Sequence, residues 1–191
     1  MVEVSRSELI LGGQKSGKSS RAELLSRAWL MASPTHRAVL VATAQAWDDE
    51  MRERIARHQT NRAQRVPGMA MVEEPVALAD ALRQHSDGHT LIVVDCLTLW
   101  LTNLMMPADP MLALGEAAVA NAVDALCAAI AQAAGPVVLV GNEIGLGVIP
   151  MGREVRTFVD VLGHLNQQVA ATCSRVTFMA AGLPLRLKDE T

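Results

Sequence analysis

Short apolar runs alternate with longer amphipathic segments along most of this chain. Runs such as "AVLVA", "LIVVD" and "VVLV" are apolar almost without interruption, which is typical of strands that are covered on both faces of a sheet. Strands are therefore expected at five places, namely 8–11, 38–42, 91–95, 137–140 and 175–180. A last short run, "LPLRLK", is expected to add an edge strand.

Helices are expected between these strands. The pattern places them roughly at 18–32, 48–58, 75–84, 112–134 and 153–172. Strands and helices that alternate in this way form a mostly parallel sheet with right-handed crossovers. The predicted fold class is therefore α/β, a three-layer fold with a mostly parallel central sheet. Because no repeat or linker interrupts the pattern, residues 1–191 are expected to form a single domain.

Composition narrows the class of protein. Half of the 191 residues are hydrophobic and the net charge is −3, which indicates a globular protein without a broad nucleic-acid-binding surface. The three cysteines, Cys96, Cys127 and Cys173, lack the short spacing of a zinc site, so reduced thiols in a cytoplasmic protein are expected. The longest apolar stretch, 111–134, is interrupted by charged and amide side chains, which argues against a membrane span.

The stretch "GGQKSGKS" begins where the first predicted strand ends. It matches the phosphate-binding pattern G-x-x-x-x-G-K-[ST] in full and precedes a helical segment. Glycines let the backbone wrap around phosphates, and the start of the helix adds its positive end. Lys18 would contact the β- and γ-phosphates, and the Ser19 hydroxyl would bind Mg²⁺. The sequence therefore predicts a P-loop NTPase fold of the RecA-like kind, with a nucleotide held by Gly12, Gly13, Gln14, Lys15, Ser16, Gly17, Lys18 and Ser19.

A second metal-binding group is expected at the end of a later strand. In "LIVVDC" the apolar run ends at Asp95, where an aspartate can bind Mg²⁺ together with Ser19. The same position also suits a helix N-cap, because "CLT" could begin a helix. The two interpretations are compatible. Both place Asp95 at the carboxyl edge of the sheet, where α/β folds bind ligands.

The segment "DDEMRERIARH" is the most unusual part of the chain. Its acidic residues occupy the first predicted helical turn and its arginines follow, as the helix dipole favours. His58 lies on the same predicted face as Met51 and Ile55. A histidine on such a face is commonly a hydrogen-bonded packing residue, but an imidazole can also act as a nucleophile. The residue types alone leave both interpretations open.

A glycine-rich stretch, "GNEIGLGVIP", follows the fourth predicted strand. Its glycines allow a tight loop beside the nucleotide, where Asn142 and Glu143 would orient an acceptor or a water molecule. A plain connection with helix-capping polar groups would give the same pattern. These residues alone do not separate the two interpretations.

Five blocks resemble the bifunctional adenosylcobinamide kinase/adenosylcobinamide-phosphate guanylyltransferase family of cobalamin synthesis. They are "GGQKSGKS", "VATAQAWDDEMRERIARH", "VVDCLTLWLTNLM", "GNEIGLGVIP" and "GHLNQQVA…AAGLPLRLK", and together they cover nearly the whole chain. The resemblance implies that ATP or GTP phosphorylates adenosylcobinamide. GMP from GTP is then transferred to adenosylcobinamide phosphate through a guanylyl-histidine, giving adenosylcobinamide-GDP and pyrophosphate. It also implies Mg²⁺ as a cofactor and a homo-oligomer, specifically a trimer.

The resemblance assigns further residues to the site. The guanylylated histidine falls on His58. Additional nucleotide contacts fall on Thr43, Ala44, Gln45, Gln59, Thr60, Asn61, Arg62, Glu73 and Asp95. The stretch after His58 is longer than the family pattern, so Arg65 is an alternative to Arg62. Val159 and His164 stand where the family has arginines, which bears on the binding of substrate phosphate.

Two other functions fit parts of the sequence. A single-function P-loop kinase of a small metabolite would keep the phosphate site and use His58 only for packing. A RecA-like ATPase module would act with nucleic acid or a protein partner. With three Trp, two Phe and no Tyr, no basic, aromatic-rich surface supports that module. A covalent GMP adduct would distinguish the bifunctional enzyme from both.

Overall fold

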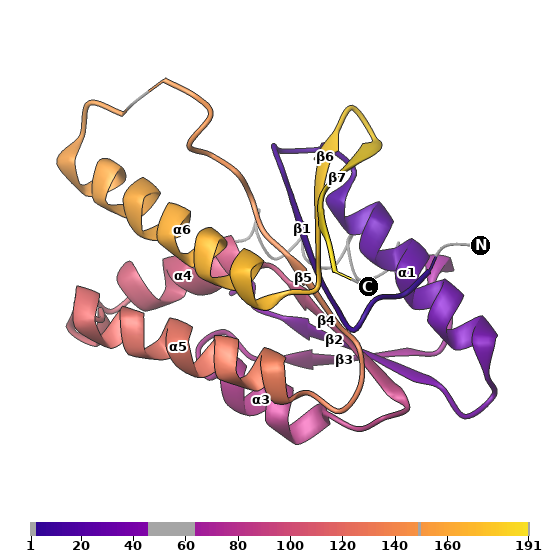
Figure 1. Ribbon diagram of the computed structural model, residues 1–191. Helices are drawn as coiled ribbons and strands as arrows, with labels where there is room; N and C mark the ends of the chain where they lie inside the picture. Colours follow the sequence, from indigo (N-terminus) through magenta and orange to yellow (C-terminus); the bar gives the residue numbers. More distant parts are fainter. Residues whose placement is uncertain (1–2, 46–63, 149, 191) are drawn as a thin grey trace.

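A computed structural model describes residues 3–45, 64–148 and 150–190. The described residues form a seven-stranded sheet in the order β3-β2-β4-β5-β1-β6-β7 (Figure 1). Its strands are β1 (Ser7–Gly12), β2 (Arg37–Ala42), β3 (Met69–Glu73), β4 (Thr90–Asp95), β5 (Val137–Val140), β6 (Arg175–Ala180) and β7 (Leu183–Asp189). Neighbouring strands run parallel except β6 and β7, which are antiparallel. The predicted mostly parallel sheet and its additional edge strand are confirmed.

Helices lie on both faces of this sheet (Figure 1). Helix α1 (Lys18–Ala32) covers one face. The other face carries α3 (Leu78–His85), α4 (Leu97–Met105), α5 (Glu116–Gln132) and α6 (Arg153–Thr172), with a 3-10 turn, η1 (Pro110–Leu112), before α5. This arrangement confirms the predicted three layers. Among the described helices, none combines the length and the hydropathy that a membrane crossing requires.

Alternate residues of the central strands enter two different cores. On β1, Ile10 packs into the core under α1, whereas Leu9 and Leu11 pack into the core under α4, α5 and α6. Leu9 and Ile10 are both 0% exposed. Burying one such side chain contributes about 1.5–3 kcal/mol. Burial on both faces explains why these strands are continuously apolar in sequence.

Several boundaries differ from the sequence pattern. Strand β3 is not predicted by it, and helix α4 appears only as the helix that "CLT" could begin. Helix α5 begins at Glu116, because Pro110 starts a separate 3-10 turn and Gly115 takes the N-cap position. Helix α3 begins at Leu78, and Glu74 accepts hydrogen bonds from the N–H groups at 76 and 77 in the turn before it. The helix expected at 48–58 lies outside the described residues.

A buried carboxylate lies near the start of β1. Glu8 is 1% exposed and accepts hydrogen bonds from Arg21 Nε at 2.6 Å and from Thr177 Oγ1 at 2.8 Å. Arg175 on β6 lies 4.0 Å from the other Glu8 oxygen and pairs with Asp189 on β7 at 2.8 Å. These contacts join α1, β1 and the β6–β7 hairpin at the amino-terminal edge of the parallel strands.

Arg175→Met is expected to lower the free energy of unfolding by about 3 kcal/mol, because it removes a cation that lies beside the buried carboxylate of Glu8. Denaturant unfolding at neutral pH measures this change. Arg186→Met is the matched control, since Arg186 also pairs with Asp189 but its side chain is 56% exposed. That control should stay within about 0.5 kcal/mol of wild type. Equal losses in the two variants would contradict the prediction.

Candidate nucleotide-binding site

The loop between β1 and α1 has a backbone that few other sequences could adopt. Gly12 has φ 151° and Gly17 has φ 104°, values that residues with a Cβ rarely take. A Cβ at Gly12 would also lie 2.4 Å from the carbonyl oxygen of Met179. Lys15 is left-handed, with φ 54°. The Ser16 hydroxyl is buried and finds no hydrogen-bond partner among the described residues, which leaves it available to a ligand.

The turn between β6 and β7 supports this loop from the side. The Gly182 N–H donates a hydrogen bond to the carbonyl oxygen of Ser16 at 2.9 Å. A Cβ at Gly17 would lie 3.1 Å from the Cα of Gly182, so the two backbones are in close contact. The "AAGLPLRLK" block at the end of the chain therefore helps to shape the phosphate loop near its beginning.

Lys18 begins α1 and folds back over the loop. Its ammonium group donates hydrogen bonds to the carbonyl oxygens of Gly12 at 3.1 Å and Gly13 at 2.7 Å. Only 9% of the residue is exposed. Burial lowers the pKa of Lys18, and nearby Cys96 and Asp95 partly offset this effect. A positive charge is thus held inside the loop, where a P-loop lysine contacts phosphate.

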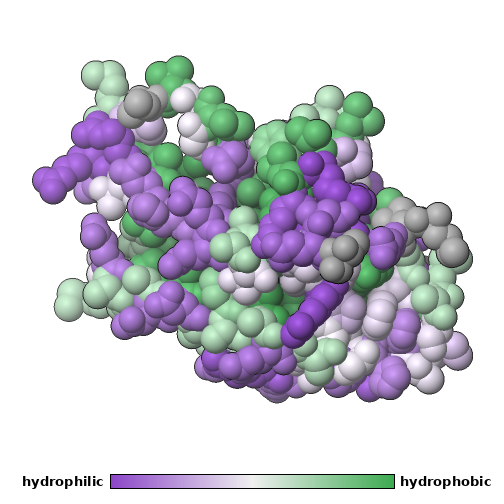
Figure 2. Space-filling model, viewed as in Figure 1, coloured by the Kyte–Doolittle hydropathy of each residue, from purple (hydrophilic) through white to green (hydrophobic). Residues whose placement is uncertain are grey.

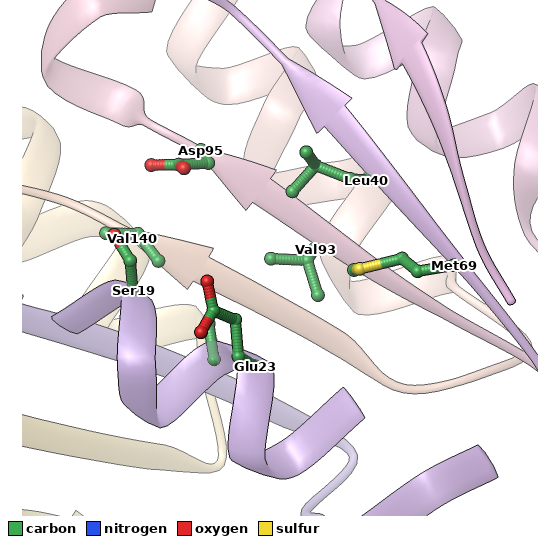
Figure 3. A pocket seen from close by; sticks show the side chains of 8 residues that line it. Ser19, Glu23, Leu40, Met69, Val93, Asp95 and Val140 are labelled. Atoms are coloured by element: carbon green, nitrogen blue, oxygen red, sulfur yellow. The ribbon is translucent and has the colours of Figure 1, made fainter. Parts of the chain in front are cut away.

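A pocket lies between α1 and the face of the sheet that α1 covers, and Asp95 and Val140 at the carboxyl ends of β4 and β5 line one part of it (Figure 3). Ser19 and Glu23 are one helical turn apart on α1 and so lie on one face of the helix, while Asp95 is the last residue of β4. Figure 3 shows these side chains on the walls of one pocket, with the Glu23 carboxylate directed into it. The remaining lining is apolar: Ala22, Leu40, Met69, Val93 and Val140. The structure therefore brings together the two residues predicted to bind metal.

These oxygen atoms suit a hard divalent cation. Mg²⁺ prefers oxygen ligands and usually binds one or two carboxylates together with phosphate oxygens and water. The hydroxyl of Ser19 and the carboxylate of Asp95 could supply this donor set beside the P-loop. Within the described ranges, no group of three or more His, Cys, Asp or Glu residues could hold a metal ion.

Strand order sets the spacing of the site. Strand β5 lies between β1 and β4, and Val140 at its end pairs with Ile10 on one side and Asp95 on the other. Neighbouring strands are about 4.8 Å apart, so β1 and β4 are about 10 Å apart. Residues 141–143 leave the sheet between the P-loop and Asp95. Hydrogen bonds tie them to the P-loop, because the Glu143 N–H donates to the carbonyl oxygen of Gly12 at 3.2 Å.

Thr43, a predicted nucleotide contact, is occupied by backbone hydrogen bonds. It is 0% exposed, and its hydroxyl donates to the Cys96 carbonyl oxygen at 2.8 Å and accepts from the Cys96 N–H at 2.9 Å. The Asn103 side chain donates to the Thr43 carbonyl oxygen at 2.7 Å. These bonds hold the ends of β2 and β4 together beside Asp95. Ala44 and Gln45 follow, half-buried, after the end of β2.

The N-cap interpretation of Asp95 is wrong. Helix α4 begins at Leu97, and its N-cap residue is Cys96. The carboxylate of Asp95 instead lies at the pocket that also contains Ser19. Of the two interpretations open from sequence, the position agrees with the metal-binding one.

Other predicted contacts lie at the margin of this site or beyond the described chain. Glu73 ends the edge strand β3 and is exposed. Four strand spacings, about 19 Å, separate β3 from β1. His58 and residues 59–62 lie outside the described residues. Arg65, the alternative to Arg62, pairs with Glu23 at 3.3 Å, so its guanidinium group contacts one of the residues that line the pocket.

Glu23 is a residue that sequence reasoning missed. Its side chain is only 13% exposed although it carries a charge. The one signal available was its spacing of four residues from Ser19, which places both on one face of a helix. Glu143, which the sequence did indicate, is drawn into the same region by its contact with the P-loop.

The fold and the loop geometry define a P-loop nucleotide-binding protein of the α/β class. Residues 8–187 match the family described as cobinamide kinase / cobinamide phosphate guanyltransferase. The chain belongs to this family, as the resemblance of its sequence blocks indicated.

Similar proteins carry related names. The chain is 46% identical to the bifunctional adenosylcobalamin biosynthesis protein CobP of Pseudomonas aeruginosa, over 96% of this chain and 98% of that protein. It is 30% identical to the bifunctional adenosylcobalamin biosynthesis protein CobU of Escherichia coli, over 94% of this chain and 98% of that protein. The CobU protein of Salmonella typhimurium is 31% identical over the same shares.

Two solved structures share the fold at low sequence identity. The flagellar accessory protein FlaH from Methanocaldococcus jannaschii superposes with a TM-score of 0.55 and 12% identity, over 99% of this chain and 80% of that chain. The protein PH0250 from Pyrococcus horikoshii gives a TM-score of 0.55 and 10% identity, over 100% and 89%. At these identities the likeness concerns the fold alone.

Proposed function

We propose that this protein phosphorylates adenosylcobinamide with ATP or GTP and then transfers GMP from GTP to adenosylcobinamide phosphate. The products of the second step are adenosylcobinamide-GDP and pyrophosphate. The observation that carries the proposal is the assembled phosphate site, in which Lys18 lies over a glycine-shaped loop and Ser19 and Asp95 line the adjoining pocket. Family membership supports the choice of acceptor.

In the phosphorylation step the protein acts mainly by position and charge. The P-loop N–H groups and Lys18 would hold the β- and γ-phosphates, and Ser19 and Asp95 would hold Mg²⁺. When bound there, Mg²⁺ neutralises charge on the transferring phosphoryl group. The acceptor hydroxyl attacks the γ-phosphorus in line with the leaving nucleoside diphosphate. Which nucleotide serves this step is not fixed by these contacts, because all of them involve phosphate.

In the transfer step we assign His58 as the nucleophile. A neutral imidazole, available near pH 7, attacks the α-phosphorus of GTP and pyrophosphate leaves. The phosphate of the acceptor then attacks the same phosphorus and the imidazole leaves. Because His58 lies outside the described residues, support for this assignment comes from the sequence resemblance.

The surface at the carboxyl ends of β5 and β6 suits a large acceptor. Figure 2 shows hydrophobic residues on two projections that flank a hollow, over the loop before α6 and over the β6–β7 turn. Exposed apolar residues of these segments include Leu146, Val148, Met151, Leu183 and Leu185.

A homo-oligomer, and specifically a trimer, remains a prediction from the family resemblance, and the exposed leucines of the edge strand β7 offer a surface for it.

Labelled nucleotides test the proposed function in the wild-type protein. GTP labelled at the α-phosphate should leave GMP on the denatured protein, and added adenosylcobinamide phosphate should discharge it as adenosylcobinamide-GDP. ATP or GTP labelled at the γ-phosphate should phosphorylate adenosylcobinamide. Phosphorylation without a protein adduct would favour a single-function kinase. Absence of both products would refute the proposal.

Asp95→Asn should raise the Mg²⁺ concentration needed for half-maximal activity by about tenfold, which corresponds to about 1.4 kcal/mol. The reason is that the amide keeps the shape of the side chain but removes the charge that attracts the cation. A Mg²⁺ titration of phosphorylation measures it, with circular dichroism as a check on folding. Asp124→Asn, an exposed position on α5, is the matched control. An unchanged titration would leave Asp95 without a role in metal binding.

A further inference from the structure

The residues that follow β5 occupy the centre of the proposed site. Strand β5 lies between β1, which leads into the P-loop, and β4, which ends at Asp95. A γ-phosphate held between Lys18 and a cation on Asp95 would therefore lie beyond the carboxyl end of β5. An acceptor that attacks this phosphate must approach across the loop after β5. Glu143 places a carboxylate in that loop.

Hydrogen bonds from neutral donors orient this carboxylate. Glu143 Oε1 accepts from the Gly145 N–H at 3.0 Å, and Oε2 accepts from Asn166 Nδ2 at 3.4 Å. Asn166 is 4% exposed and also donates to the carbonyl oxygen of Asn142 at 3.2 Å, so it is itself fixed. An ionised carboxylate can accept about four hydrogen bonds. Both Glu143 oxygens therefore keep the capacity to accept one from a substrate.

The backbone of Glu143 is attached to the P-loop. Its N–H donates to the Gly12 carbonyl oxygen at 3.2 Å, and Gly12 is also one of the two carbonyl partners of Lys18. The carbonyl oxygen of Gly12 therefore accepts hydrogen bonds both from the backbone of Glu143 and from the ammonium group that would hold the γ-phosphate. This attachment holds the backbone of Glu143 next to the P-loop.

We propose that Glu143 accepts the proton of the acceptor hydroxyl during phosphorylation, an inference that rests on the function proposed above. The hydroxyl oxygen forms a bond to the γ-phosphorus, and the bond from this phosphorus to the nucleoside diphosphate breaks. The hydroxyl proton goes to the Glu143 carboxylate, which then releases it to water. An alcohol needs such a partner because it is a weak nucleophile on its own. Asn166 is a positioning residue, since its side chain donates a hydrogen bond to the carboxylate.

This role separates the two reactions of the protein. In the guanylyl transfer the attacking groups are an imidazole nitrogen and a phosphate oxygen, and neither is a hydroxyl group. Loss of the Glu143 carboxylate should therefore impair phosphorylation and spare the transfer of GMP. A residue that merely shaped the P-loop would impair both reactions, because both use the same phosphate site.

Glu143→Gln tests the proposal, since glutamine keeps the length of the side chain and its amide oxygen can still accept from the Gly145 N–H. The kcat of phosphorylation should fall about 10²–10⁴-fold. The dissociation constant of a non-hydrolysable ATP analogue, GMP labelling from GTP, and transfer to supplied adenosylcobinamide phosphate should stay near wild type. Glu154→Gln, which neutralises an exposed carboxylate in the first turn of α6, is the matched control and should retain both reactions.

Glu143→Asp is the second variant, and it tests the role of Glu143 if the glutamine substitution disturbs folding. It keeps the charge but withdraws the oxygens by one methylene, so phosphorylation should fall while GMP labelling persists. Undiminished phosphorylation in either folded variant would overturn the proposal, as would an equal loss of both reactions. If the wild type forms no phosphorylated acceptor, the proposed function fails first. If the wild type is active and the variants match it, only the role of Glu143 fails.

Discussion

Lys18→Met should abolish both activities, with phosphorylation and GMP labelling each reduced about 10³-fold or more. The Lys18 ammonium group is almost enclosed and is held by the carbonyl oxygens of Gly12 and Gly13. Phosphate oxygens of a bound nucleotide would take over these contacts. Methionine fills the space without the charge, so the loss should appear in nucleotide affinity, measured by calorimetry with a non-hydrolysable GTP analogue, while the melting temperature changes little.

The pH dependence of nucleotide binding follows from the same burial. Because burial lowers the pKa of Lys18, its positive charge is lost at a lower pH than that of an ordinary lysine. Nucleotide affinity should therefore be full at neutral pH and fall as the pH rises through this lowered pKa.

The matched control for Lys18→Met is Arg27→Met, which removes an exposed cation from the same helix and should keep both affinity and turnover. Turnover in a folded Lys18→Met protein would contradict the P-loop assignment.

The sequence pattern predicted correctly the helices and strands whose apolar residues are buried. Helices α1 and α6 have the expected bounds, and the central strands are nearly as expected, because their apolar residues face a core. Strand β3 was missed since it lies at the sheet edge and most of its side chains are exposed; the backbone ladder to β2 holds it. Helix α4 was indicated only as a possible start at "CLT", because its apolar residues follow those of β4 with only Asp95 and Cys96 between them.

The site was predictable where a motif fixes its geometry locally. Residues 12–19 follow from a pattern in which the loop and the helix start belong to one stretch of chain. The meeting of Ser19, Glu23 and Asp95 depends instead on β4 lying two strands from β1, and that order is set by long-range strand pairing. The packing of Gly182 against the P-loop depends on the final hairpin in the same way. Periodicity along the chain carries no information about such contacts.

His58→Ala should abolish the attachment of GMP to the protein and the formation of adenosylcobinamide-GDP from adenosylcobinamide phosphate. GTP labelled at the α-phosphate should mark the wild type through a bond that is stable in alkali and labile in acid, as a phosphoramidate is. Phosphorylation of adenosylcobinamide uses the P-loop, a cation and a positioned hydroxyl group with its base Glu143, but not His58, so it should survive in this variant. Denaturing gels and mass spectrometry of the labelled peptide measure the first effect.

Two further variants make this result specific to the imidazole nitrogen. His58→Asn keeps a planar polar group but removes the nucleophile, so it should behave as His58→Ala does. His164→Ala removes an exposed histidine of α6 and should keep the label. A label that persisted without His58, or that mapped to His164, would contradict the assignment. Loss of both the label and phosphorylation would show instead that His58 supports the fold or the shared phosphate site. A nucleophile that acts only in GMP transfer can be removed without impairing phosphorylation.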